Sequence, residues 1–274
     1  VHAPSATAPA AIAEVARNSR RVAMAELCDQ CTVRVRTGPR TVHPRTSHRA
    51  LAHPGPSYHP GMRMLAIVVG VLALLTPRAD LRTGHVLVAN QQSGSASLID
   101  LATDTAKVIA VGEGPHEAVI APSGRIGVVT VYGIAGKPGN QLAVIDIAKG
   151  VVTSTISLGT YTRPHGANFL PGDEARIAVT SESTKNLLIV NIAKGEVEQV
   201  VATEAAGSHM VAISADGKVA TTSNITGGSV SMFQLGAPAK LSKVIPTAPQ
   251  TEGIAIEPSG KFVWAATNTG LVNV

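Results

Sequence analysis

One sequence pattern recurs four times between residue 85 and the end of this 274-residue chain. Each copy has a His or Glu before an apolar segment, then a turn containing Gly, then further short apolar segments. The marker residues are His116, His165, His209 and Glu252, which are separated by 49, 44 and 43 residues. A repeat of about 40 to 50 residues built only of short strands is typical of one blade of a β-propeller.

Short strands are expected throughout the repeats. The apolar segments predict three strands in a partial blade before the first marker, four strands in each of the next three blades and three in the last, which makes 18. We therefore predict an all-β fold, a β-propeller of four-stranded antiparallel blades with about four and a half blades present. Because 18 strands do not make whole blades, we expect part of a larger ring. The alternative is a closed four-blade ring in which residues 254–257 complete the first blade, and it leaves residues 262–274 without a place.

The chain divides into three parts by composition. Residues 1–61 hold 8 Arg, 3 acidic residues and no Lys, and they show no sustained apolar period. We expect a disordered arm or an over-extended translation start there. Residues 62–82 place Arg63 before an apolar run, as in a secretory signal peptide, and the run is too short to span a bilayer comfortably. The alternative for this run is a short buried or membrane-anchoring helix.

Residues 83–274 then form the partial propeller, and the leader predicts export to the periplasm or the extracellular space without a stable membrane span. The formal net charge of +5 comes from the leader, because residues 83–274 hold 12 basic and 14 acidic side chains. These repeats have no basic stripe interleaved with aromatic residues, so we expect no nucleic-acid partner. The pair Cys28 and Cys31 has no second pair to complete a zinc site, and Thr32 rather than His follows it.

Four short motifs follow one another at the start of the repeats. They are Val88-Ala89-Asn90, Ala96-Ser97-Leu98-Ile99-Asp100, Gly112-Glu113-Gly114-Pro115-His116 and Ala121-Pro122-Ser123-Gly124. Together these motifs resemble the YVTN-family β-propeller repeat. The resemblance covers residues 85–274 and implies an exported propeller, usually of seven blades, of which this chain would be a truncated example. Related seven-bladed proteins include lactonases and electron-transfer or cofactor-binding propellers. The chain departs from the pattern in its length and at Phe233-Gln234, where the repeat ends in Ile-Asp.

Candidate site residues lie where a propeller opens around its channel, because ligands bind in that concave mouth. The loops that lead into the inner strands carry His116, Glu117, Arg163, His165, His209 and Glu252. The loops between second and third strands carry Asn90, residues 132–140 with Lys137, residues 182–185, residues 224–228 and Asn268.

Three imidazoles from successive blades, His116, His165 and His209, have the chemistry to bind a divalent metal ion as cofactor. The same groups suit a general acid and base that open a lactone. A residue found at one place in every repeat more often serves the repeat, here by bonding backbone in the loop that leads into the blade.

Side chains that depart from the repeat are better functional candidates. Glu117 stands where the next blade has Gly166, Glu252 stands where His is expected, and Arg163 is the only Arg in these loops. Residues 133–140 account for most of the longest spacing, and we expect a flexible insertion over the channel mouth or a surface loop there.

These observations predict an exported binding or interaction module that engages a small molecule or a protein at the propeller face. The alternative is a lactonase-like hydrolase in which His116, His165, His209 and Glu252 position a metal ion or water. Binding and catalysis both stay open at this point.

Overall fold

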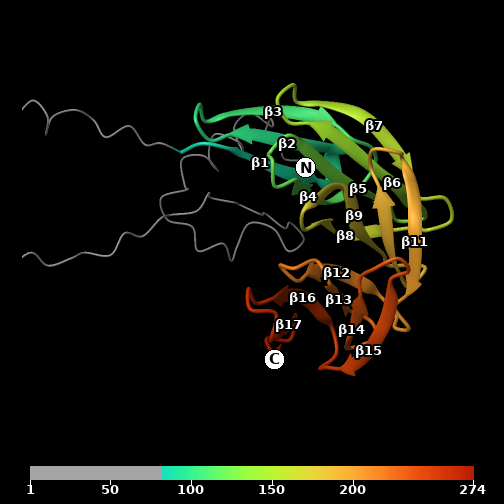
Figure 1. Ribbon diagram of the computed structural model, residues 1–274. Helices are drawn as coiled ribbons and strands as arrows, with labels where there is room; N and C mark the ends of the chain where they lie inside the picture. The colour runs from blue at the N-terminus through green and yellow to red at the C-terminus, as the bar shows by residue number, and fades with distance from the viewer. Residues whose placement is uncertain (1–81) are drawn as a thin grey trace, which may run out of the picture. The chain divides into compact units, whose positions relative to one another are not determined.

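A computed structural model describes residues 82–274 of the protein as five antiparallel β-sheets (Figure 1). The first sheet contains β1 (His85–Asn90), β2 (Ser95–Asp100) and β3 (Thr105–Ala110), with a one-turn 3-10 helix, η1 (Gln91–Ser93), between β1 and β2. The second contains β4 (Pro115–Ile120), β5 (Ile126–Ile134), β6 (Lys137–Asp146) and β7 (Val151–Ser157). The third contains β8 (Pro164–Leu170), β9 (Asp173–Ser181), β10 (Asn186–Asn191) and β11 (Glu196–Ala202). The fourth contains β12 (Ser208–Ile213), β13 (Val219–Asn224), β14 (Ser229–Gln234) and β15 (Lys240–Pro246). The fifth contains β16 (Thr251–Ile256), β17 (Val263–Thr267) and β18 (Val272–Asn273).

Each strand pairs with the next strand in the chain, and neighbouring sheets meet through their first strands. Strand β4 lies beside β8, β8 beside β12, and β12 beside β16. In Figure 1, β7, β11 and β15 lie on the outer side of their sheets. This is the arrangement of propeller blades, and the predicted all-β fold with 18 strands is confirmed.

Two sheets are incomplete at opposite ends. Asn90 at the end of β1 donates from Nδ2 to Ser95 and Ser97, at 3.1 and 2.9 Å. Asn224 at the end of β13 makes the same pair of bonds to the hydroxyls of β14, so β1 corresponds to a second strand of a blade. Within residues 82–274, the first sheet thus has no innermost strand and the fifth has no outermost one. Since β16 pairs with β17 in its own sheet, the closed four-blade alternative is wrong.

The core lies between sheets, because the middle strands of a blade are covered on both faces. Strand β10 shows the pattern most clearly, since five of its six residues are buried. Leu188 and Val190 pack against the second sheet, whereas Leu187 and Ile189 pack against the fourth. Alternating side chains of one strand therefore fill two interfaces. With three Phe in the chain, these interfaces consist chiefly of Val, Ile, Leu and Ala.

The segment at residues 133–140, for which the sequence predicts a flexible insertion or a surface loop, forms the end of a paired hairpin. Strands β5 and β6 continue into it, with Gly133 opposite Pro138 and Ile134 opposite Lys137. The glycines bring the two backbones close together, because a Cβ on Gly133 would lie 2.1 Å from the Gly139 nitrogen. The additional residues thus lengthen one hairpin of the second sheet. Among residues 82–274 no helix is long and apolar enough to cross a membrane.

A β-bulge interrupts the first strand of each of the last four sheets. The pairing register shifts between Pro115 and Ala118 in β4, and at the corresponding places in β8, β12 and β16. The bulged backbone N–H bonds a hydroxyl of the second strand instead of a ladder carbonyl. These pairs are Glu117 N with Thr130 Oγ1 at 2.9 Å, Gly166 N with Thr180 Oγ1 at 2.9 Å, and Met210 N with Ser223 Oγ at 3.1 Å.

The same hydroxyls also link one sheet to the next. Thr180 Oγ1 donates to the His209 carbonyl at 2.5 Å, and Ser223 Oγ donates to the Glu252 carbonyl at 2.6 Å. Both hydroxyls are buried. Each therefore satisfies a bulged N–H in its own sheet and a carbonyl in the sheet that follows.

We predict that Thr180→Val destabilises the protein by about 1–3 kcal/mol. Valine has a similar shape but no hydroxyl, so the buried Gly166 N–H and the His209 carbonyl lose this partner. Urea unfolding of the full chain measures the change in free energy of unfolding. The control is Thr155→Val on β7, an exposed site where we expect a change within about 0.5 kcal/mol. Equal effects of the two substitutions would refute a linking role for Thr180.

Candidate functional site

Three histidines lie at the second position of the first strand in successive sheets, on β4, β8 and β12. The sequence predicts them in loops, but the structure places His116, His165 and His209 within the strands, at the bulges. Glu252 has the same position on β16. The difference arises because each inner strand begins three residues earlier than its apolar segment suggests. A bulge re-aims the side chains on it, which here brings the imidazoles together.

The three imidazoles form a stack across three sheets. The ring centroids of His116 and His165 are 4.0 Å apart, and those of His165 and His209 are 3.7 Å apart. The rings are tilted by 45° and 40°. His165, in the middle, is only 2% exposed. The first strands of adjacent sheets are neighbours, so one side chain repeated on each of them produces contacts of this kind.

Burial keeps the middle and last members of the stack neutral near pH 7. It lowers the pKa of His165 well below its usual value, and His209 and His116 lower it further by charge repulsion. Burial also lowers the pKa of His209, to about 4. Removal from water disfavours the charged form of an imidazole, and a like charge nearby has the same effect. These two imidazoles are therefore polar but uncharged near pH 7.

A carboxylate lies at each end of the stack. Glu117 Oε1 is 3.8 Å from His116 Nδ1, and Glu252 Oε1 is 3.9 Å from His209 Nε2. The Glu117 side chain is 7% exposed and that of Glu252 is 42% exposed, so the two acids occupy different environments. His209 Nδ1 also lies 3.3 Å from the Glu252 carbonyl.

Two ring nitrogens in the stack lack hydrogen bonds. Within residues 82–274, the Nδ1 atoms of His116 and His165 are buried and have no hydrogen-bond partner. The prediction that the repeated histidines bond the local backbone is therefore wrong for these two atoms. That role belongs to the second-strand hydroxyls.

Three residues bring potential metal-ligand atoms together. One atom each from His116, Glu117 and His165 lies within 4.8 Å of the other two. This set differs from the predicted metal ligands, because it contains Glu117 and lacks His209. Glu117 was identified in the sequence by its departure from the repeat, but its pairing with two histidines depends on the bulge.

A second group of side chains adjoins the stack. The Tyr132 ring lies 5.0 Å from the ring of His116 and, edge-on, 5.6 Å from that of His165. The Arg163 guanidinium carbon lies 4.7 Å from the Tyr132 ring centroid, within the range of a cation–π contact. The Tyr132 hydroxyl donates to Glu182 Oε1 at 3.1 Å. Burial raises the pKa of Tyr132, and the charge of Glu182 raises it further.

Arg163 is held by its backbone. Its φ is +54°, its N–H donates to the Gly139 carbonyl at 2.8 Å, and its own carbonyl accepts from Glu182 N at 3.0 Å. The extended hairpin of β5 and β6 thus positions the residue next to Tyr132. The sequence located this region, at residues 132–140 and 182–185, but did not single out Tyr132 or Glu182. The rarity of tyrosine, with three in the whole chain, is the sequence signal that could have identified Tyr132.

Lys137 forms an ion pair with Glu113 and not with the residues of the histidine stack. Its ammonium is 2.7 Å from Glu113 Oε2, and both side chains are more than half exposed. Of the predicted site residues, the structure thus brings His116, Glu117, Arg163 and His165 into one cluster around Tyr132. His209 extends the stack and Glu252 lies at its far end.

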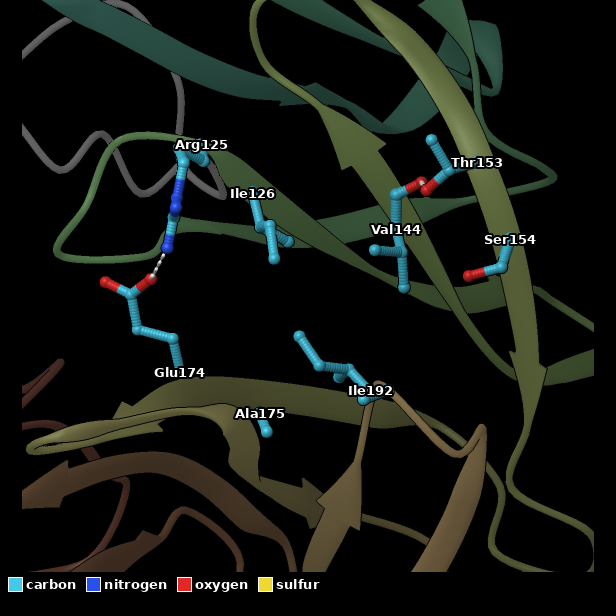
Figure 2. Close-up of a pocket in the computed structure, with 9 residues that line it drawn as sticks. Arg125, Ile126, Val144, Thr153, Ser154, Glu174, Ala175 and Ile192 are labelled. Atoms are coloured by element: carbon cyan, nitrogen blue, oxygen red, sulfur yellow. Dashed lines mark hydrogen bonds and ion pairs between the residues drawn. The ribbon is translucent and has the colours of Figure 1, made fainter.

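A hollow of about 310 Å³ lies between the second and third sheets, away from this cluster (Figure 2). Its lining includes Ile126 at the start of β5, whereas Pro115 beside the stack pairs with Val131 near the other end of β5. The polar side chains that line it are largely paired with their surroundings. Arg125 and Glu174 form an ion pair at 3.8 Å, and the Thr153 hydroxyl donates to the Val144 carbonyl at 3.2 Å. We therefore assign the candidate site to the histidine cluster and not to this hollow.

The fold and the cluster together define a partial β-propeller with a stack of histidines on its inner strands. No protein-family model and no curated protein matches the chain. Several solved structures, however, match its fold. Hydrazine synthase of Kuenenia stuttgartiensis aligns with 66% of this chain and 52% of its own, at 19% identity and a TM-score of 0.59.

Two other structures give similar values. A functionally unknown protein of Desulfotomaculum acetoxidans aligns with 69% of this chain and 65% of its own, at 17% identity and a TM-score of 0.58. A chain of a mitotic checkpoint complex aligns with 70% and 58%, at 11% identity and a TM-score of 0.60. This chain thus spans about half to two thirds of the length of each. At these identities the likenesses show the fold alone.

We predict that the protein, kept free of metal with EDTA, loses stability as the pH falls from 7 to 5. The folded pKa of His209, about 4, is below the unfolded value of about 6.5. The unfolded chain then binds more protons below pH 6.5, and stability falls down to the folded pKa. The expected loss from His209 is about 2 kcal/mol, with a further loss from His165.

Urea unfolding at the two pH values tests this. His209→Gln should reduce the pH dependence, whereas His85→Gln, which alters a histidine of β1 outside the stack, is the matched control. Equal free energies of unfolding at pH 7 and pH 5 would contradict the assignment of neutral, buried rings.

Proposed function

We propose that the protein is an exported binding module that engages a small molecule or a protein partner at the histidine cluster. The observation that carries this proposal is the position of side chains that the repeat does not require. Glu117, Tyr132, Arg163 and Glu182 have no shared role in the blades, yet they adjoin the stack on β4 and β8. Polar groups that converge at one face of a repeat fold are typical of a ligand site.

The chemistry of the cluster favours a ligand with an anionic group. Arg163 carries five N–H donors, and one of them donates to the Ile134 carbonyl at 3.4 Å. Its fork geometry suits a carboxylate or a phosphate. The aromatic face of Tyr132 and the rings of His116 and His165 supply flat surfaces beside it.

A lactonase-like hydrolase is the second candidate. One observation favours it, namely the compact donor set of His116, Glu117 and His165, which could hold a metal ion or orient a water molecule. In this form of the proposal Glu117 takes the place of Glu252 and His209.

Export is the other part of the proposal. Its support is the basic and apolar pattern of residues 62–82, which lies almost wholly outside the described residues, and the lack of cysteine in residues 83–274. The motifs that resemble the YVTN family agree with it. The proposed setting is the periplasm or the extracellular space.

We predict that the binding of anionic ligands depends on Arg163. A panel of carboxylates, phosphate esters and lactones is screened by thermal shift against the full chain. Compounds that raise the melting temperature should lose at least about tenfold in affinity with Arg163→Gln, the size of a lost charge-assisted pair. Arg125→Gln, in the hollow of Figure 2, is the control and should leave affinity unchanged.

Compounds that Arg163→Gln and Arg125→Gln both bind as tightly as the unsubstituted protein does would contradict the assignment of the ligand site to Arg163. Turnover of a lactone by the parent, lost in Glu117→Gln, would replace the binding role with the hydrolytic one.

We predict that a chain beginning at Met62 is exported and cleaved near Ala79 when it is expressed in a bacterial host. The apolar run is the part that the export machinery recognises, so Leu72→Arg should block both steps. Cell fractionation and N-terminal sequencing measure the outcome. An uncleaved cytoplasmic product from both chains would refute export.

A further inference from the structure

Two buried nitrogens and a buried carboxylate meet at the bulge of β4. The Nδ1 atoms of His116 and His165 have no hydrogen-bond partner within residues 82–274. Buried polar atoms are normally paired, so an unpaired one calls for an explanation such as a bound ion. Glu117 Oε1 lies 3.8 Å from His116 Nδ1.

The bulge explains how neighbouring residues contribute to one site. In a regular strand, His116 and Glu117 would point to opposite faces of the sheet. The register shift between Pro115 and Ala118 removes that alternation, and ligand atoms of the two residues come within 4.8 Å of each other. His165 contributes the third atom from the corresponding bulge of β8.

The repeat does not require the carboxylate. The Glu117 N–H performs the structural role at the bulge by bonding Thr130, and Gly166 and Met210 perform the same role in the next two sheets without a carboxylate. An acid is therefore added at one bulge, beside two histidines. Glu252, at the other end of the stack, is a natural comparison because it is more exposed and lies outside the compact donor set.

We propose that His116, Glu117 and His165 bind a divalent first-row transition ion, with Zn²⁺ as the best match. Two imidazole nitrogens and one carboxylate oxygen form a known three-ligand zinc set, to which water or a bound molecule adds a fourth ligand. Tetrahedral ligands of zinc are about 3.3 Å apart. The spacing here is within 4.8 Å, so rotation of the side chains by small amounts completes the site. The site does not depend on the proposed anion-binding role of Arg163.

The test measures binding of Zn²⁺ alone to the full chain. Cys28→Ser and Cys31→Ser are present in every sample, because thiolates are zinc ligands and this pair would otherwise add to the measured binding. Isothermal titration and competition with a chromophoric chelator give stoichiometry and affinity. The d–d absorption of Co²⁺ gives an independent signature of the coordination.

We expect the parent to bind one more ion than His116→Asn. Glu117→Gln, which is isosteric, should weaken this binding about tenfold or more, whereas Glu252→Gln should leave it unchanged. Melting of each variant in EDTA verifies its fold, and Glu117→Gln remains informative if His116→Asn is unstable.

Equal stoichiometry and affinity in the parent and in Glu117→Gln would overturn the proposal. So would an ion that is lost with Glu252→Gln but retained with Glu117→Gln, because the site would then lie at the other end of the stack. Loss of anion binding in Arg163→Gln with zinc binding intact would leave the metal site standing.

Discussion

The arrangement of the inner strands depends on one hydroxyl in the second strand of a sheet. Thr180 and Ser223 each accept from a bulged N–H and donate to a carbonyl of the following sheet. A hydroxyl is suited to this place because it is both donor and acceptor within a small volume. Valine would fill the space but would leave two buried backbone groups without this partner, and such groups are expensive in a core.

The bulge and the histidine stack follow from this interaction. A bulge at the same place in each first strand turns one side chain out of the regular alternation, and the hydroxyl satisfies the backbone that the bulge exposes. Repetition at the spacing of the blades then brings the imidazoles within 4.0 Å of each other. Thr130 donates weakly back to the Glu117 carbonyl, at 3.4 Å, rather than to the next sheet. The hydroxyl link between successive sheets is thus least regular at the bulge that carries Glu117.

Sequence reasoning predicted the strands well and the site only in part. The 18 strands could be predicted because alternating apolar residues and turns containing Gly are local signals, and Gly124, at φ +74°, shows the backbone that such a turn needs. The first residues of the inner strands were missed, since Pro115 and His116 break the apolar pattern. A bulge is a property of two paired strands, so one strand's sequence does not reveal it. The hairpin at residues 133–140 was misjudged for the same reason, because its glycines allow close pairing as well as flexibility.

The contacts around Tyr132 could not be predicted from the sequence either. Tyr132, Arg163 and Glu182 are separated by 31 and 19 residues, and contact among them requires both the extended hairpin and the neighbouring sheet. The sequence could identify Arg163 only as unusual. The predictions for residues 1–61 and for nearly all of residues 62–82 lie outside the described residues and stay predictions.

The two acids of the stack differ in a way that repetition alone does not explain. Glu252 replaces a histidine at the repeated position and its side chain is 42% exposed, so water reaches its carboxylate. Glu117 follows the repeated histidine and is buried, where a carboxylate is costly without a partner. A repeat fold can carry a buried acid at one blade only if something local offsets that cost. His116 lies at 3.8 Å, and a ligand atom of His165 lies within 4.8 Å, so both imidazoles are close enough to contribute to that offset, directly or through a shared cation. The proposed chemistry of this protein therefore centres on β4, the inner strand that adds an acid to the repeated histidine.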